Sequence, residues 1–196
     1  MRARTQWLAL LVASVLAGAW GCGGFGKVNQ GRVVTFDPEQ GLLTLILDSN
    51  YREPGKPRYD VLPPVRVRVP EDPSAMGPAP QAGGLIELDV RGRRLVIFDA
   101  ASQSLKTLRC QLLEVAEGVG SSDRRLAGVR FPVVDRAKGS VTVYSAKKRQ
   151  LVTFSVPAEY LVLPRSTWMV GDEVRYYFKD PGQALRLMNV TKTEVS

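Results

Sequence analysis

Beyond residue 30, the sequence has no stretch in which apolar residues recur with the 3.6-residue period of an amphipathic helix. It consists of short runs rich in Val, Leu, Phe and Thr, separated by turns that contain Asp, Gly or Pro. Residues 65–69 show the pattern most clearly, because valines alternate with arginines and only the valines are expected to face a core. We therefore predict an all-β chain of about 11 short strands.

One turn pattern occurs more than once. Residues 36–41 (FDPEQG) place Asp at the start and Gly at the end of a short loop, which favours a type I turn closed by a residue with positive φ. Residues 134–139 (VDRAKG) repeat it. Either the same type of hairpin turn occurs independently at several places, or the chain contains two duplicated β units. We expect β domains at residues 31–117 and 129–196, as two small OB-like or SH3-like β-barrels, or a single β-sandwich-like domain.

The first 21 residues have the pattern of a secretory signal peptide. Arg2 and Arg4 precede an uncharged, mostly apolar run at residues 7–20, which is shorter than the roughly 20 residues of a spanning helix. Gly21 and Cys22 follow, so the leader resembles that of a bacterial lipoprotein, whose new N-terminal cysteine carries the lipid. Lipidation is therefore expected at Cys22, with residues 22–30 as a Gly-rich tether. An uncleaved N-terminal anchor and ordinary secretion remain the alternatives, since Trp20 is atypical of a lipoprotein cleavage site.

Composition excludes several kinds of chemistry. The chain has no histidine and two cysteines, which removes Ser-His and Cys-His nucleophiles and most zinc or copper sites. Without residues 1–21, which contain two arginines and no acid, the net charge falls from +8 to +6. Because acids and bases alternate along the chain, we expect a solvated surface and no nucleic-acid partner. Cys110 lies in a strand-like run and is predicted to be a buried structural thiol without a disulfide partner.

Two other patterns are assigned to turns and loops. Residues 145–148 match the S-x-x-K motif of penicillin-binding enzymes, but they are expected in a hairpin turn and the partner motifs are missing. Acidic residues gather in two long loops without the spacing of a calcium site, so no metal or cofactor is predicted. These acids are Asp48, Glu53, Asp60, Glu71 and Asp72.

The strand predicted at residues 173–179 contains the candidate binding face. Val174, Tyr176 and Phe178 should face the core, which leaves Arg175, Tyr177 and Lys179 on the other side. A basic and aromatic strip of this kind is how OB-folds present their ligands, and Trp168 is a candidate to extend it. Alternatively, Tyr177 pairs across the sheet and Trp168 fills the core.

Three stretches together resemble a known family: GKVNQGRVVTFDPEQGLLTL, FPVVDRAKGSVTVYS and PRSTWMVGDEVRYYFKDPGQALRLMNVTKTE. They are similar to an uncharacterised family of lipoproteins, a domain of unknown function found in sulfate-reducing and related bacteria. The tail is also similar to the closing strands of small OB-like periplasmic barrels. The resemblance implies no activity and no functional residue. For a lipoprotein, Gly23 after the cysteine implies the outer membrane.

The sequence therefore predicts a lipid-anchored protein of the cell envelope that faces the periplasm. We expect it to be a non-catalytic binding or assembly module, held to the membrane by its N-terminal lipid and bound to an envelope protein. A small-ligand or saccharide-binding protein that uses Arg175 and Tyr177 is the alternative. An enzyme working through carboxylates or tyrosine is the third hypothesis.

Overall fold

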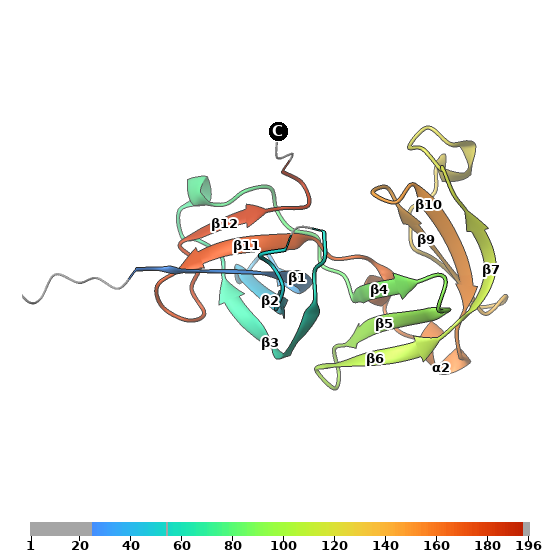
Figure 1. Ribbon diagram of the computed structural model, residues 1–196, viewed down its shortest axis with the longest axis horizontal. Helices are drawn as coiled ribbons and strands as arrows, with labels where there is room; N and C mark the ends of the chain where they lie inside the picture. The colour runs from blue at the N-terminus through green and yellow to red at the C-terminus, as the bar shows by residue number, and fades with distance from the viewer. Residues whose placement is uncertain (1–24, 54, 194–196) are drawn as a thin grey trace, which may run out of the picture.

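The computed structural model describes residues 25–53 and 55–193, so the predicted leader and Cys22 lie outside the described residues. The fold is all-β, as predicted, with three antiparallel sheets (Figure 1). The strands are β1 (Lys27–Asp37), β2 (Leu42–Asp48), β3 (Tyr59–Arg68), β4 (Leu85–Asp89), β5 (Arg94–Asp99), β6 (Ser104–Arg109), β7 (Gln111–Ala116), β8 (Val133–Asp135), β9 (Ser140–Ser145), β10 (Gln150–Ser155), β11 (Glu173–Phe178) and β12 (Arg186–Asn189). The helical elements are η1 (Pro73–Ala75), η2 (Arg124–Leu126), α2 (Ala158–Leu161) and η3 (Arg165–Trp168).

The first lobe is a five-stranded sheet in the order β12-β11-β1-β2-β3, hereafter the curled sheet. Its inward side chains form one hydrophobic core, because alternate residues of each strand point to the same face. Single bridges join the end of β3 to Gln183, and Met76 to Leu187 in β12. These are isolated bridges and not strand ladders, so the sheet curls without closing a barrel. The buried core residues are Val33, Leu43, Leu45, Val67, Val174, Tyr176, Phe178, Ala184 and Leu187.

The second lobe is a β-sandwich. A three-stranded sheet, β4-β5-β6, packs against a four-stranded sheet, β7-β10-β9-β8, and their facing side chains share a second core. Cys110 lies between β6 and β7, so one bent segment contributes an edge strand to both sheets. Its thiol is buried and free, as predicted. The sandwich-like alternative for the fold is thus the one that the structure supports.

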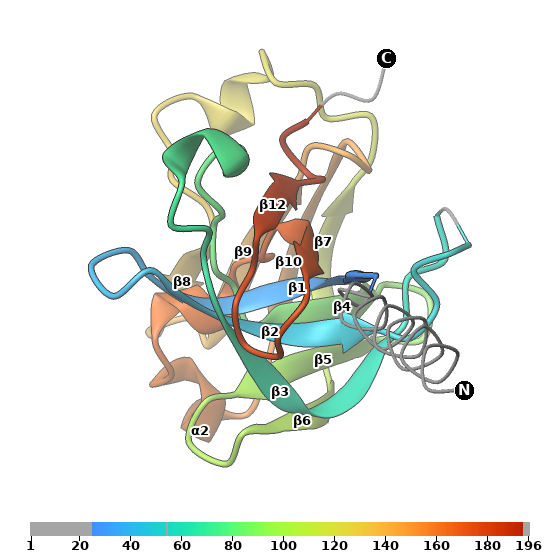
Figure 2. The same cartoon turned by 90° about the vertical axis from the view of Figure 1, so that its left-hand side faces the viewer.

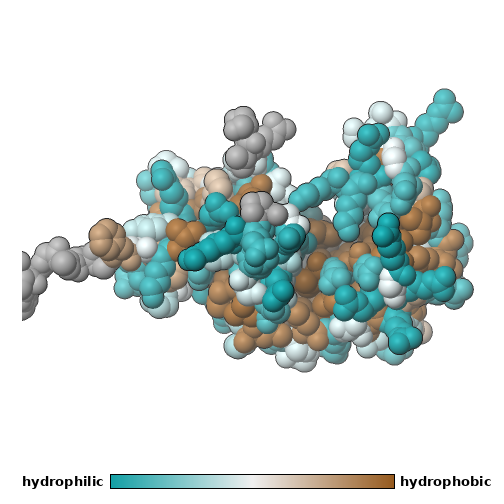
Figure 3. Space-filling view, viewed as in Figure 1, coloured by the Kyte–Doolittle hydropathy of each residue, from teal (hydrophilic) through white to brown (hydrophobic). Residues whose placement is uncertain are grey.

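The two lobes pack against each other through a third, smaller core. Val34, Ile46 and Tyr59 of the curled sheet contact Phe98 of β5, with Ile86 and Leu105 at the margin. Figure 1 shows the lobes side by side along the longest axis, with β1 starting at one end and β7, β9 and β10 lying toward the other, and Figure 2 views the molecule along this axis from the end of the curled sheet. On the face shown in Figure 3, hydrophobic residues gather along the lower side of the curled sheet and between the lobes.

The two lobes do not correspond to the expected units of residues 31–117 and 129–196, because strands from both units pair in the curled sheet. β11 and β12 come from the C-terminal part of the chain, yet β11 pairs with β1, from Lys27↔Phe178 to Arg32↔Glu173. The sandwich lobe is therefore inserted between β3 and β11, and the chain crosses between the lobes twice. The sequence pattern marks each strand but not its partner, because pairing between distant strands leaves no local signal.

The same four-residue turn joins five pairs of consecutive strands. It ends on a residue with positive φ in each case: Gly41, Arg93, Gln103, Gly139 and Arg149. In the first turn, the Asp37 carboxylate accepts hydrogen bonds from the amides of Glu39 and Gln40, which holds the chain in the turn. Five such turns in one chain favour independent use of the same hairpin turn, since those ending at Arg93, Gln103 and Arg149 lie outside the repeated pattern at residues 36–41 and 134–139.

Two boundaries differ from the prediction. β1 begins at Lys27, inside the expected tether of residues 22–30, because residues 27–30 pair with β11. β3 begins at Tyr59 and runs through Pro63 and Pro64, a stretch expected to be loop. Proline is tolerated there because β3 is an edge strand, whose outer amides need no partner strand. Among the described residues, no helix is long and apolar enough to cross a membrane.

Candidate functional site

The predicted alternation of β11 is confirmed. Val174, Tyr176 and Phe178 are buried in the core of the curled sheet, whereas Arg175 is exposed on the opposite side. Across the sheet, Tyr177 stands between Val28 of β1 and Arg186 of β12. Directly paired residues share a face, so these side chains belong to one surface. We call this surface the outer face and define it by Val28, Gln30, Arg175, Tyr177 and Arg186.

Hydrogen bonds organise the centre of the outer face. Gln30 is only 6% exposed; its Oε1 accepts a hydrogen bond of 2.8 Å from Arg175 Nε, and its Nε2 donates to a carboxylate oxygen of Glu173. Gln30 therefore bridges a base and an acid that lie two residues apart on β11. Among the described residues, the remaining N–H groups of the Arg175 guanidinium have no hydrogen-bond partner and can donate to an anionic ligand.

Tyr177 is less accessible than the sequence predicted. Its phenol ring lies so close to the backbone of Gly26 that a Cβ on this glycine would overlap the ring. The ring is half-buried as a result. The last residues before β1 therefore cross the outer face beside Tyr177, and Lys179 follows at the exposed end of β11. Arg175, Tyr177 and Lys179 are thus brought together, with Gly26 against the Tyr177 ring.

Trp168 does not belong to this surface. It is 1% exposed at the end of η3, where it packs in the sandwich core with its ring centroid 6.1 Å from that of Phe154. The alternative interpretation, in which Trp168 fills the core, is the one that the structure supports. Sequence proximity to β11 was misleading because the chain passes from one lobe to the other between residues 168 and 173.

Two further polar groups lie where the curled sheet meets the sandwich. Arg32 Nη2 donates a 3.0 Å hydrogen bond to the hydroxyl of Tyr59, and its guanidinium carbon stands 4.4 Å from the centre of that ring. Burial raises the pKa of Tyr59 to about 12, although the nearby Arg32 charge acts in the opposite direction. The phenol therefore stays protonated at neutral pH and is not a general base. This pair joins β1 to β3 within the curled sheet, and Tyr59 also packs in the small core between the lobes.

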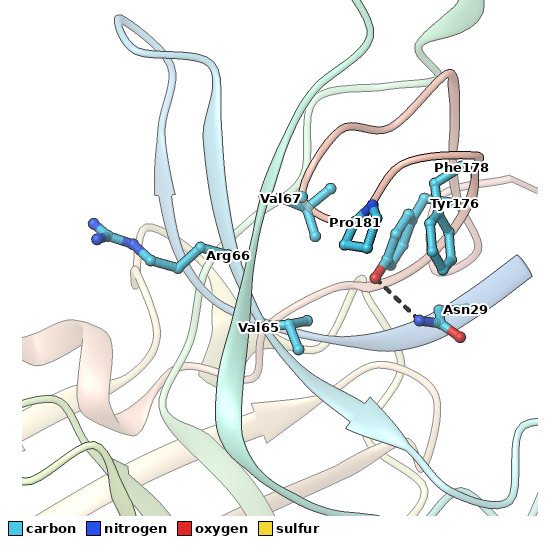
Figure 4. A pocket seen from close by; sticks show the side chains of 8 residues that line it. Asn29, Val65, Arg66, Val67, Tyr176, Phe178 and Pro181 are labelled. Carbon is cyan, nitrogen blue, oxygen red and sulfur yellow. Dashed lines mark hydrogen bonds between the residues drawn. The ribbon is translucent and has the colours of Figure 1, made fainter. Parts of the chain in front are cut away.

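The other side of β11 lines a hollow of about 480 Å³ at the open edge of the curled sheet (Figure 4). Val65 and Val67 face Phe178 across it, and Asn29 donates a 3.2 Å hydrogen bond to the Tyr176 hydroxyl at its floor. Burial raises the pKa of Tyr176, so this phenol also stays protonated. The hollow is the gap that remains because β3 and the β11–β12 turn meet only at single bridges.

Two of the five loop acids, Asp48 and Asp72, accept hydrogen bonds from backbone amides. Asp48 is buried, in contrast to the solvated position expected, and its Oδ1 accepts hydrogen bonds from the amides of Asn50 and Arg58. Asp72 caps η1 by accepting from the amide of Ser74. Ser145 Oγ accepts from the amide of Lys148 in the β9–β10 turn. Within residues 25–53 and 55–193, no three acidic or cysteine side chains are grouped as metal ligands.

The far end of the sandwich lobe is basic. Residues 117–170 contain nine Lys and Arg residues against four Asp and Glu residues. Two of its loops are fastened together, since the Val119 amide donates to the Arg149 carbonyl at 2.8 Å and the Tyr144 hydroxyl donates to the Val119 carbonyl at 3.1 Å. At this end, Leu113 and Val115 of edge strand β7 are 51% and 38% exposed.

Comparison with known proteins assigns the chain to a family. Residues 24–196 match the family described as Domain of unknown function (DUF4881). The chain belongs to this family. No curated protein and no solved structure matches it. Family membership therefore covers all three sheets, from before β1 to the C-terminus, and brings no assigned activity with it.

Sequence reasoning missed three members of the outer face. Val28 and Gln30 were assigned to the tether, and Arg186 was given no role. Residues 27–30 carry no clear alternation, because apolar Val28 is exposed and polar Asn29 pairs with the core residue Tyr176. The register of β1 also shifts between Val33 and Thr35. Nothing local indicated that Arg186 stands beside Tyr177, since this depends on the β11–β12 register.

Proposed function

We propose that this DUF4881 protein is a lipid-anchored cell-envelope protein, attached through Cys22 and working as a non-catalytic binding or assembly module. The observation that carries the proposal is the spacing between the Gly21-Cys22 cleavage pattern and the first strand. Lys27 opens β1 only five residues after Cys22. A linker of this length spans at most about 18 Å, so a lipid on Cys22 would hold the curled sheet against the membrane.

The position of β1 also separates the two ends of the molecule. β1 starts at one end of the long axis, and the four-stranded sheet lies at the other (Figure 1). An anchor at Cys22 therefore leaves the far end of the sandwich free to face the periplasm. Its basic loops and the exposed apolar side chains of edge strand β7 favour a protein partner with an acidic surface.

The proposed anchor makes a direct prediction about processing. Replacing Cys22 with Ser removes the thiol that receives the lipid, so the protein is expected to leave the detergent phase and the precursor to remain uncut. Detergent-phase partitioning and the mass of the N-terminal peptide measure both effects. Cys110→Ser is the matched control, because this buried thiol is far from the leader and its loss should leave partitioning unchanged. Wild-type protein found in the aqueous phase and cleaved elsewhere would contradict the anchor.

The proposed partner surface is tested by capture from envelope membranes with the full chain as bait. Changing both Leu113 and Val115 to Lys should lower recovery of a stoichiometric acidic partner about tenfold or more, because apolar contacts at an interface centre dominate its affinity. Val61 and Leu62, on the edge strand of the other lobe, have similar exposure and serve as the matched Lys control pair. Equal recovery by both double variants would contradict a partner at β7.

Small-ligand or saccharide binding at the outer face is the second candidate. It is favoured by the free guanidinium N–H groups of Arg175 beside the Tyr177 ring and Arg186. In this case, Arg175→Ala with Tyr177→Ser should abolish capture of the ligand, whereas the β7 double variant should not.

A further inference from the structure

We propose that the surface beside the tether is a membrane-contact surface that binds anionic lipid headgroups. We define the tether-proximal surface by Phe25, Lys27, Val28, Lys179, Leu185 and Arg186. The inference rests on the proposed anchor at Cys22 and goes beyond it, because it assigns a lipid chemistry and an orientation to a particular part of the protein surface.

The residues of this surface meet at one end of the curled sheet. Lys27 is paired with Phe178, directly before Lys179, so it lies on the inner side of the sheet at this end, whereas Tyr177 is paired with Val28 and Arg186 on the outer face. The amide of Leu185 donates a 2.8 Å hydrogen bond to the Tyr177 carbonyl, which places the start of β12 beside the end of β11. Three strands and the last residues before β1 therefore contribute to one continuous edge. Figure 2, viewed from this end, shows β1, β11 and β12 together.

The exposed side chains suit the headgroup region of a bilayer. Phe25 is fully exposed, and Val28 and Leu185 are 40% and 45% exposed, which is unfavourable in water but favourable at the acyl boundary. Lys27, Lys179 and Arg186 are exposed among them, and within the described part of the chain none of them forms a salt bridge. Basic residues held near an anionic leaflet are attracted to it within a Debye length. The half-buried Tyr177 ring lies against Gly26, which places the last described residues before β1 beside this edge.

The short linker between Cys22 and Lys27 favours a membrane over a soluble anion as the ligand of this surface. A lipid on Cys22 keeps Lys27 within about 18 Å of the bilayer at all times, so the effective concentration of headgroups at this surface is high. The more basic far end of the sandwich lies at the opposite end of the long axis. The geometry therefore assigns lipid headgroups to the tether-proximal surface and leaves the far end for a soluble partner.

The test uses the full lipid-anchored chain, reconstituted either in detergent or in phosphatidylethanolamine vesicles with or without phosphatidylglycerol. A water-soluble amine reagent modifies exposed lysines, and mass spectrometry measures the rate at each site. On vesicles with phosphatidylglycerol, modification of Lys27 and Lys179 is expected to slow about fivefold or more, and high salt should reverse the effect. Lys147 and Lys148, in the exposed β9–β10 turn, are the internal reference and should react at the same rate throughout.

Two double variants distinguish direct contact between the tether-proximal surface and the membrane from general electrostatic attraction of the basic protein to anionic lipid. Phe25→Ser with Arg186→Gln should remove most of the protection of Lys27 and Lys179. Val162→Ser with Arg124→Gln removes one exposed apolar side chain and one exposed arginine from the sandwich lobe and should change nothing. Equal modification of Lys27 in all three preparations overturns the proposal, as does protection of Lys147 and Lys148 instead. The mass of the Cys22 peptide reports separately on the anchor, so a missing lipid refutes the proposed function whatever the lysines show.

Discussion

Replacing Asp172 with Ala is expected to lower the free energy of unfolding by about 2–4 kcal/mol, because its loss leaves the buried Asn189 side chain and the Gln81 amide without their charged acceptor. Asp172 is 5% exposed where the chain returns from the sandwich lobe to the curled sheet. Its Oδ2 accepts hydrogen bonds from the Gln81 amide at 2.8 Å and from Asn189 Nδ2 at 2.9 Å, and it lies 3.2 Å from Lys192 Nζ. The carboxylate therefore ties three separate segments together.

The loss is large because the surrounding backbone has no room to rearrange. A Cβ on Gly171 would overlap the carbonyl oxygen of Val33, and one on Gly83 would overlap the carbonyl of Met169. The two crossings between the lobes are thus packed backbone to backbone, and the amide of Val33 donates to the Asp172 carbonyl at 2.9 Å. Asn189 is fully buried, so its stranded Nδ2–H donor cannot turn toward water and bears its desolvation cost.

Urea unfolding followed by far-UV circular dichroism measures the change. Asp123→Ala is the matched control, since this carboxylate also accepts a backbone hydrogen bond and pairs with an arginine, but at an exposed loop. It should leave the midpoint close to that of the wild type, because exposed pairs contribute little. If Asp172→Ala unfolds at the same urea concentration as Asp123→Ala, the Asp172 carboxylate does not stabilise the two segments that cross between the lobes.

The sequence was sufficient for the parts of the fold that depend on neighbouring residues. Alternation predicted the buried face of β11, and the Asp-to-Gly spacing predicted the β1–β2 and β8–β9 turns, because these features arise within a few residues. Cys110 was correctly placed in a buried position from its strand-like surroundings. These are local consequences of side-chain direction and turn chemistry.

Pairing between distant strands was not predictable from the sequence. Nothing in residues 27–32 indicates that they pair with residues 173–178, and so neither the insertion of the sandwich lobe nor the contact of Arg186 with Tyr177 was foreseen. The misplacement of Trp168 has the same origin. Its side chain turns toward Phe154 because the crossing begins immediately after it, which only the three-dimensional path of the chain reveals.

Truncation of Trp168 is the second change with a large expected effect. Trp168 is the bulkiest of the fully buried side chains and closes the sandwich core beside Phe154. Replacing it with Ala should cost about 3–5 kcal/mol, because apolar area is lost and a cavity remains. The same urea experiment detects it, and the far-UV signal is needed because the substitution removes the fluorescent side chain itself.

Trp168→Phe distinguishes packing from hydrogen bonding at this site. The indole Nε1 is buried without a hydrogen-bond partner among the described residues, so the wild-type ring bears an unsatisfied donor. Leaving such a donor buried costs about 1–3 kcal/mol, and phenylalanine removes it while keeping an aromatic ring against Phe154. The gain offsets much of the lost volume, so Trp168→Phe should stay within about 1.5 kcal/mol of the wild type. A loss as large as that of Trp168→Ala would mean that the indole N–H is satisfied, for example by a buried water, and that its hydrogen bond helps to hold the crossing in place.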